Sequence, residues 1–290
     1  MVGASGCGVD VDETVGAWNA SAGAAAAGRL AGLAIECAVQ MALSGEVTGI
    51  VTAPIDKSAL LAGGFDYPGH TEMLAALTDS RVAMMLTSAD SSERSANPLR
   101  VVLATTHVAL RDVVATVTTE TILQVSRITR EYLARWFRVD TPRIALCALN
   151  PHGGDSGRFG DEDDRILAPA AREAGIAGPF PADTVFVRAM QGEFDAVIAP
   201  YHDVGMTAIK VASFGRAVNV TLGLPFPRTS PDHGTALDIA GRDVADPSSF
   251  TEAVLLCRRI AFRAQPLAGL QSYADPQTAT RSAGRRPRAR

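Results

Sequence analysis

Residues 198–241, IAPYHDVGMTAIKVASFGRAVNVTLGLPFPRTSPDHGTALDIAG, decide how this chain is interpreted. Apolar runs of strand-like length alternate here with turns rich in Gly, Pro and Asp, and chargeable residues stand where the runs end. The polar side chains that stand out are His202, Lys210, Asn219, Arg228 and His233. Because loops at strand ends carry much of the chemistry of α/β proteins, this stretch predicts an α/β enzyme with functional residues at one edge of a sheet.

The rest of the chain supports the α/β class. Helical patterns cover residues 21–44, 119–137 and 247–264, and Gly45 is placed to end the first of them. Apolar, β-branched runs at 47–55, 82–88, 99–107, 143–150 and 196–202 predict buried strands between further helices. Strands and helices that alternate in this way predict a largely parallel sheet.

Composition excludes several classes of protein. The 290 residues are 47% hydrophobic and 20% charged, as in an ordinary globular protein, and the net charge of −4 gives no reason to expect a nucleic-acid partner. No uninterrupted apolar run of about 18 residues predicts a membrane span. The four cysteines lack CxxC spacing, which favours a reducing, cytoplasmic location. Residues 1–20 and the arginine-rich residues 271–290 are expected to be poorly ordered.

Three apolar runs end in the same way, at His107, His152 and His202. Strand-end histidines could converge at one rim of a sheet, where three neutral imidazoles would hold a divalent metal and leave a position open for chemistry. The alternative is three independent, hydrogen-bonded histidines. Spacing alone leaves both interpretations open.

Other residues are suited to a small anionic substrate. Lys210, Arg228 and His70 offer positive charge, whereas Asn219 and Thr71 offer neutral hydrogen bonds. Thr71 is a candidate helix N-cap, which would place His70 at a helix N-terminus where anions are favoured. The alternative for each is a surface charge or a local cap.

The motifs TAPIDK, YPGHTE, ATTHVALRD, NPHGGD and GPFPADT, followed by FGRAVNVTLGLPFPRTSPDHGTALDIAG, together resemble the 4-hydroxythreonine-4-phosphate dehydrogenase family. The likeness covers about residues 21–265. It implies a two-lobed α/β/α fold like that of isocitrate and isopropylmalate dehydrogenases, and a cytoplasmic homodimer with its site near the subunit interface. By analogy, residues 21–65 and 221–270 would form a first lobe on the NAD side, and residues 66–220 a second lobe on the metal and dimer side.

The resemblance also implies a reaction: oxidation of 4-phosphooxy-L-threonine by NAD (or NADP), then decarboxylation to 3-amino-2-oxopropyl phosphate, for vitamin B6. One divalent ion per subunit (Zn, Mg or Co) would lie on His107, His152 and His202. The implied substrate contacts are His70, Thr71, Lys210, Asn219 and Arg228, with Lys210 and Asp203 as candidates for proton transfer. The segment that resembles an adenosine-binding loop would contact NAD through His233, Gly234, Thr235, Asp238 and Gly241, unless it is only a structural turn.

Three departures from the family pattern leave alternatives open. The strand and GDPAGIGPE segment with which the family usually begins are absent, so we expect an N-terminally shortened fold. Val204 and Asp155 replace the usual Gln and Glu beside ligand histidines. The chain could therefore be a dehydrogenase of 4-phospho-D-erythronate or 4-phospho-D-threonate, or an inactive truncated relative. A dehydrogenase of dihydrodiol dicarboxylates is less compatible with the GHTE motif at 69–72.

Overall fold

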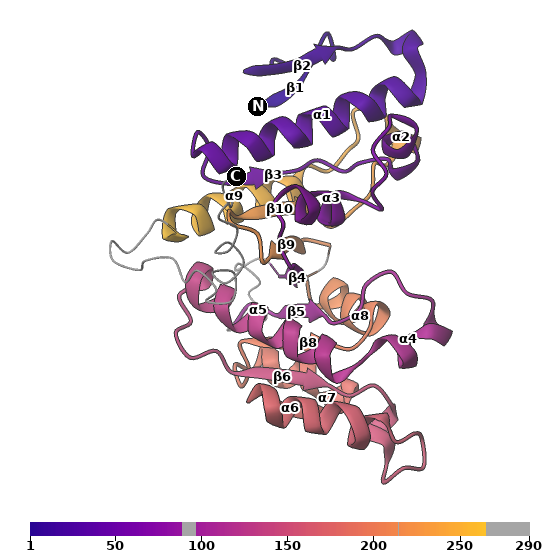
Figure 1. Ribbon diagram of the computed structural model, residues 1–290, viewed down its shortest axis with the longest axis vertical. Coiled ribbons are helices and arrows are strands. Elements are labelled where there is room, and N and C mark those ends of the chain that lie inside the picture. Colours follow the sequence, from indigo (N-terminus) through magenta and orange to yellow (C-terminus); the bar gives the residue numbers. More distant parts are fainter. Residues whose placement is uncertain (89–96, 214, 265–290) are drawn as a thin grey trace, which may run out of the picture.

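An eight-stranded sheet runs through the molecule in the order β3-β10-β9-β4-β5-β8-β6-β7. The structure is a computed structural model and describes residues 1–88, 97–213 and 215–264. In Figure 1 the strands follow one another along the long axis, with β3 toward the top and β6 toward the bottom. The strands are β3 (Ile50–Val51), β4 (Ala83–Thr87), β5 (Arg100–Leu103), β6 (Ile144–Cys147), β7 (Ala177–Phe180), β8 (Ala196–Ala199), β9 (Val218–Leu222) and β10 (Arg228–Pro231).

Helices cover the sheet and join its strands. They are α1 (Gly23–Ser44), α2 (Lys57–Ala62), α3 (His70–Leu77), α4 (Leu110–Thr116), α5 (Thr119–Phe137), α6 (Ala168–Ala174), α7 (Ala182–Met190), α8 (His202–Ser213) and α9 (Ser248–Ala264). The predicted limits of α1, α5 and α9 are confirmed to within about two residues. Gly45 ends α1 in the left-handed conformation, at φ 83°, as predicted.

Both faces of the sheet are buried where β5 and β8 lie. Val102 and Ile198 belong to the core beneath α5, α6 and α9. Val101 and Val197, the neighbouring residues along each strand, belong to the core beneath α7 and α8. Successive side chains of a strand point to opposite faces, so a strand covered on both faces needs the continuous apolar run that predicted these two strands.

The sheet is mixed rather than largely parallel, which corrects the prediction. β5, β8, β6 and β7 are parallel, and β3 is parallel to β10. Between these groups β10, β9, β4 and β5 pair in antiparallel fashion. Strand direction depends on pairing between distant segments, and the apolar pattern of each strand does not encode it.

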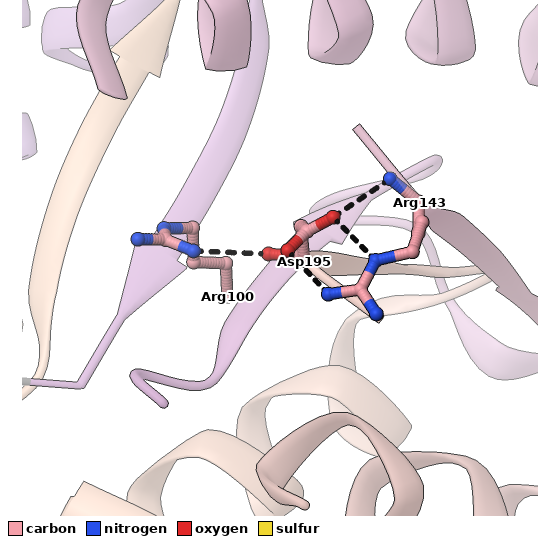
Figure 2. A network of polar contacts seen from close by, with 3 residues as sticks. All are labelled: Arg100, Arg143 and Asp195. Carbon is pink, nitrogen blue, oxygen red and sulfur yellow. Dashed lines mark hydrogen bonds and ion pairs between the residues drawn. The ribbon is translucent and has the colours of Figure 1, made fainter. Parts of the chain in front are cut away.

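Asp195 links the N-terminal ends of three parallel strands, β5, β8 and β6, through contacts with Arg100 and Arg143 (Figure 2). Its carboxylate accepts hydrogen bonds from the backbone N–H of Arg143 (2.8 Å) and from the Arg143 guanidinium (3.0 and 3.1 Å). Its carbonyl oxygen accepts a bond from Arg100 at 3.2 Å. Burial alone would raise the pKa of the Asp195 carboxyl, but the Arg143 hydrogen bonds outweigh it and hold that pKa below the ordinary value. The C-terminal ends of these strands lead to the predicted site residues His107, His202 and His152.

The first residues of the chain differ from the expectation of poor order. β1 (Val2–Ser5) and β2 (Glu13–Ala17) form a separate parallel pair that lies over α1 (Figure 1). Main-chain hydrogen bonds hold such a pair and require no apolar period, which is why the composition of residues 1–20 did not reveal it. Residues 271–290, predicted to be a disordered tail, lie outside the described residues.

Two further elements depart from the predictions. Residues 202–213, interpreted as part of strand-like runs, form helix α8. Helix α3 was placed in the second lobe, but its Met73 and Leu74 share a core cluster with Ile35 and Val39 of α1. The division into lobes stays a prediction, with α3 belonging to the side of α1.

Among the described residues, helix α1 has the length and the apolar composition of a helix that could cross a membrane. In the fold it packs on α2 at very short range. A Cβ added at Gly28 would lie 1.7 Å from the Ala59 carbonyl oxygen, and one at Gly63 would lie 2.3 Å from the Arg29 nitrogen. The glycines of α1 therefore provide the surface on which α2 packs.

Candidate active site

A cavity of about 410 Å³ gathers most of the predicted site residues. The ends of β3, β9 and β10, the starts of α2 and α3, and one face of α8 surround it. The predicted residues that line it are His70, Thr71, His107, His202, Lys210, Asn219, Arg228, His233 and Gly234. The predicted residues His152, Asp203, Thr235, Asp238 and Gly241 are not among its lining residues.

Arg228 is a buried cation whose hydrogen-bonding capacity is only partly used among the described residues. Its side chain reaches from β10 to β9, where Nη1 donates to Thr221 Oγ1 at 3.1 Å, and to the residue after β3, where Nη2 donates to Thr52 Oγ1 at 2.6 Å. The residue is 2% exposed, and burial lowers the pKa of its guanidinium to about 10, so it stays protonated at neutral pH. Nε and the nearby Asn219 Oδ1 are buried without a hydrogen-bond partner among the described residues. Unpaired polar atoms of this kind favour a bound ligand.

His70 does not supply the positive charge that the sequence predicted. It is the first residue of α3, and burial, together with the adjacent Arg228 charge, lowers the pKa of its imidazole to about 3. The imidazole is therefore neutral and acts only as a hydrogen-bonding group. Thr71 is not the N-cap either, because Gly69 occupies that position and makes no side-chain cap. The first N–H groups of α3, which lack partners within the helix, stand beside the cavity.

Helix α8 brings three of its residues to the cavity. His202, Met206 and Lys210 are four residues apart and lie on one helical face. Lys210 Nζ lies 3.3 Å from Asp232 Oδ2 and 3.4 Å from the Asp232 carbonyl oxygen. Burial raises the pKa of the Asp232 carboxyl, and the Lys210 charge opposes that rise. The two residues link helix α8 to the start of the predicted NAD loop.

Two of the three predicted metal ligands lie together. The rings of His107 and His202 are 5.6 Å apart between centroids and tilted by 42°. Desolvation, with the nearby Lys57 and His202, lowers the pKa of His107, which favours the neutral imidazole that binds metals. His202 Nδ1 lies 2.7 Å from Asp203 Oδ1, which leaves Nε2 free. A carboxylate that orients a histidine in this way is common beside metal ligands.

His152 does not join them within one chain. It is exposed, at φ 55°, in the turn after β6. Asp163 holds this turn by accepting bonds from the N–H groups of Leu149 (2.8 Å) and Asn150 (2.9 Å). Among the residues that the structure describes, no group of three His, Cys, Asp or Glu side chains could hold a metal ion. Among the described residues, a single chain therefore brings two of the three predicted imidazoles together.

Asp203 and Val204 face another hollow. Both line a groove of about 800 Å³ between α7 and α8, whose other lining residues are mainly apolar. Asp203 has an 83% exposed side chain and is placed to orient His202 rather than to contact a substrate in the cavity. Val204 likewise does not border the cavity in this chain. Asp155, the other departure from the family pattern, pairs with Arg158 at 3.5 Å in the turn that carries His152.

The predicted NAD loop leaves the cavity at His233 and Gly234. Its remaining residues lie at the surface, and a Cβ added at Gly234 would meet no atom within 4 Å. The apolar Leu237 is also exposed. The structure therefore leaves the backbone at Gly234 and the side chain of Leu237 accessible.

Three charged residues of the cavity lining were not predicted: Lys57, Glu72 and Asp232. Lys57 could have been found, because the chain has only two lysines and the other, Lys210, is one of the predicted site residues. Glu72 and Asp232 lie inside the GHTE and SPDHGT motifs, directly beside the predicted residues Thr71 and His233. A second cavity, of about 420 Å³, shares His70 but is lined mainly by apolar residues of α1 and β3 and offers fewer groups for chemistry.

Comparisons with known proteins agree on one family. Residues 7–257 match the family described as the pyridoxal phosphate biosynthetic protein PdxA. The chain is 45% identical to a 4-hydroxythreonine-4-phosphate dehydrogenase of Xanthomonas axonopodis pv. citri (strain 306) over 76% of its own length and 68% of that relative. A crystal structure of the enzyme of that name from Klebsiella pneumoniae matches with a TM-score of 0.73 and 42% identity, over 82% of this chain and 71% of that one. A terephthalate 1,2-cis-dihydrodiol dehydrogenase from Burkholderia xenovorans LB400 matches with a TM-score of 0.59 and 25% identity, over 89% and 83% of the two chains.

Proposed function

We propose a function for this chain from one premise: the chain belongs to the family of the pyridoxal phosphate biosynthetic protein PdxA. The proposed reaction is the NAD-linked oxidation of 4-hydroxythreonine 4-phosphate at its C3 hydroxyl, followed by loss of CO₂ to give 3-amino-2-oxopropyl phosphate. The observation that supports it best is one cavity that holds a buried, incompletely paired Arg228 beside two adjacent imidazoles. The first group suits an anionic substrate and the second suits a metal.

The chain's own residues anchor and orient the substrate in this proposal. Arg228 Nε and Asn219 Oδ1 belong to residues of the cavity lining and have no hydrogen-bond partner among the described residues, so they are suited to bind polar groups of the substrate. Neutral His70 and Thr71 add hydrogen bonds from the start of α3. Lys210, held by Asp232 at 3.3 Å, is placed to exchange a proton with the reacting hydroxyl or with the product after CO₂ leaves.

His107 and His202 fit a divalent ion, which we place on their free nitrogens. Two imidazoles favour Zn²⁺ or Co²⁺ over Mg²⁺, because Mg²⁺ prefers oxygen ligands. When bound, the ion supplies Lewis-acid polarisation of the reacting oxygen, and NAD on the His233–Gly241 side supplies a hydride acceptor. Asp203, whose Oδ1 lies 2.7 Å from His202 Nδ1, would leave Nε2 as the nitrogen that could bind the ion.

The third ligand is His152 of a second subunit in this proposal. The apolar groove between α7 and α8 is lined by Tyr201 and Asp203, the chain neighbours of His202, so a partner that covers it would lie close to His202. His152 is exposed and does not reach the other two histidines of its own chain. A homodimer with its site near the interface agrees with both observations.

The reaction is tested by following NADH formation with 4-hydroxythreonine 4-phosphate and added Zn²⁺, Co²⁺ or Mg²⁺, before and after exhaustive chelation. We expect turnover that chelation abolishes and that one of these ions restores. The same assay with 4-phospho-D-erythronate, 4-phospho-D-threonate and a cis-dihydrodiol dicarboxylate identifies the preferred substrate. Turnover that survives chelation would eliminate the metal, and preference for another acid would reassign the substrate.

The shared site is tested by mixing two inactive variants, His107→Ala and His152→Ala, after joint unfolding and refolding. If ligands come from two chains, a mixed dimer restores one intact site, and about a quarter of the wild-type activity should return. If all three ligands come from one chain, the mixed dimer contains no intact site. Refolded wild type and each variant alone serve as controls, and absence of recovery would contradict the arrangement.

A further inference from the structure

Lys57 is a cation in the cavity that nothing in the proposed chemistry has used. It is the first residue of α2, it lines the cavity and its side chain is exposed. With the residues that the structure describes it makes no hydrogen bond or ion pair. The other lysine, Lys210, is held by Asp232. Lys57 is therefore a positive charge in the cavity that is available to a ligand.

The end of the Lys57 side chain lies over the start of α3. A Cβ added at Gly69, the N-cap of α3, would lie 3.6 Å from Lys57 Cε and 3.5 Å from Glu72 Oε2. Lys57 and Glu72 approach the same point but form no ion pair. Because Gly69 has no side chain, the space between the lysine and the first turn of α3 stays open to the cavity.

The cavity is lined by three cations, Lys57, Lys210 and Arg228, and by two carboxylates, Glu72 and Asp232, so a net positive charge is left to favour an anion. His70, the first residue of α3, is neutral and cannot neutralise one, so Lys57 and the positive end of the helix provide the attraction. The unpaired Arg228 Nε, in a residue that is 2% exposed, independently indicates that the same cavity takes an anionic ligand. The substrate of the proposed reaction has a phosphate group with two negative charges.

We propose that Lys57 binds the substrate's phosphate against the N-terminus of α3. The inference rests on the proposed function, because it takes the substrate from there. Lys57 then determines specificity: it distinguishes a phosphorylated hydroxy acid from the same acid without phosphate.

The first test compares Lys57→Met with wild type on 4-hydroxythreonine 4-phosphate and on unphosphorylated 4-hydroxythreonine. Loss of one charge-assisted hydrogen bond should raise KM for the phosphorylated substrate roughly 10- to 100-fold. The rate with the unphosphorylated substrate should change less than about twofold, since that substrate lacks the group. Lys57→Arg should recover most of the loss. An equal loss on both substrates would overturn the assignment to phosphate.

The second test needs no turnover and so separates this inference from the proposed function. Inorganic phosphate should raise the Tm of wild type, and Lys57→Met should abolish most of that rise. Arg111→Met, which removes an exposed charge on α4 outside the cavity, should keep it. An inactive wild type that still shows this pattern would refute the reaction but support the phosphate site. No rise in wild type, or an equal rise in Lys57→Met, would overturn the inference.

Discussion

Arg228 shows how one residue can be both structural and free to bind. Its two Nη atoms donate to Thr221 on β9 and to Thr52 just after β3, so the position of the guanidinium is set before any ligand binds. Only Nε is left without a partner among the described residues. Because the Arg228 side chain is already held in place, little side-chain conformational entropy is lost when a ligand binds to Nε.

Arg228→Lys keeps the charge but loses this geometry. A lysine cannot donate to both threonines and to a ligand from a planar fork, so we expect kcat/KM to fall roughly 100-fold. Steady-state kinetics measure the change, and the Tm shift caused by substrate should shrink in parallel. Arg111→Lys is the control at an exposed position. Activity within threefold of wild type would show that Arg228 does not contact the substrate.

The neutral state of His70 leads to a prediction for the pH dependence of stability. Its pKa is about 3 in the folded chain, below the ordinary value of 6.5, because burial and Arg228 disfavour the charged form. The unfolded chain binds the proton more readily, so the contribution of His70 is complete above about pH 6.5 and is lost as the pH falls toward 3. Its share of the slope is at most about 1.4 kcal/mol per pH unit.

His70→Asn should therefore lose less free energy of unfolding than wild type between pH 7 and pH 4.5. Urea unfolding of the metal-free protein at several pH values measures the difference. The exposed His152→Asn variant is the control for replacing a histidine. Parallel curves for wild type and His70→Asn would mean that His70 carries no such shift.

Among the elements, α1 and α2 depend on the absence of side chains between them. The backbone of α2 at Ala59 occupies the place where a Cβ of Gly28 would lie, 1.7 Å from its carbonyl oxygen. A Cβ at Gly32 would instead meet the ring of Phe65 at 2.1 Å. A side-chain ring can turn aside more easily than a backbone can move. Replacing glycine by alanine should therefore lower the free energy of unfolding more at position 28 than at position 32.

Gly28→Ala should reduce the free energy of unfolding by roughly 2–4 kcal/mol, as severe overpacking outweighs the gain in helix propensity of about 1 kcal/mol. Gly32→Ala should cost less. Denaturant unfolding of both variants measures the order of the effects. A Gly28→Ala protein as stable as wild type would contradict the close packing of the two helices.

The turn after β6 depends on Asp163 in a similar way. This carboxylate is 1% exposed and accepts two backbone N–H groups that have no other acceptor in the described residues. Asp163→Ala should cost roughly 2–4 kcal/mol, because both donors lose their partner in a buried place. Asp161→Ala removes an exposed carboxylate that pairs with Arg165 at 3.4 Å and should cost below about 1 kcal/mol. Equal effects in urea unfolding would contradict the role of Asp163.

For the whole molecule, the groove between α7 and α8 is the surface that we expect a second subunit to cover. Val211, on its lining, is 70% exposed in the single chain. Val211→Glu should convert a dimer to a monomer at micromolar concentration, because a buried unpaired carboxylate is costly. Analytical ultracentrifugation measures the change, and Leu61→Glu on α2, also exposed, is the control. If both variants keep the same association state, the interface lies elsewhere.

Part of the site could be predicted from the sequence because its residues stand at the ends of recognisable runs. His107 follows the apolar run of β5, and Arg228 lies among motifs that resemble one family. Helix α8 was missed because its short apolar run was compatible with either a strand or a helix. Gly205 packs there at close range, where an added Cβ would lie 2.7 Å from Leu103, a contact that involves the distant strand β5.

The sequence by itself determined the α/β class, the limits of long helices such as α5, and the family, because each depends on patterns within a segment or on the order of motifs along the chain. Tertiary structure decided the direction of the central strands, the placement of His107 beside His202 without His152, and the neutral state of His70. Each of these depends on which distant residues meet and on how far they exclude water. Local composition sets the kinds of group that are available, and packing decides which of them act together.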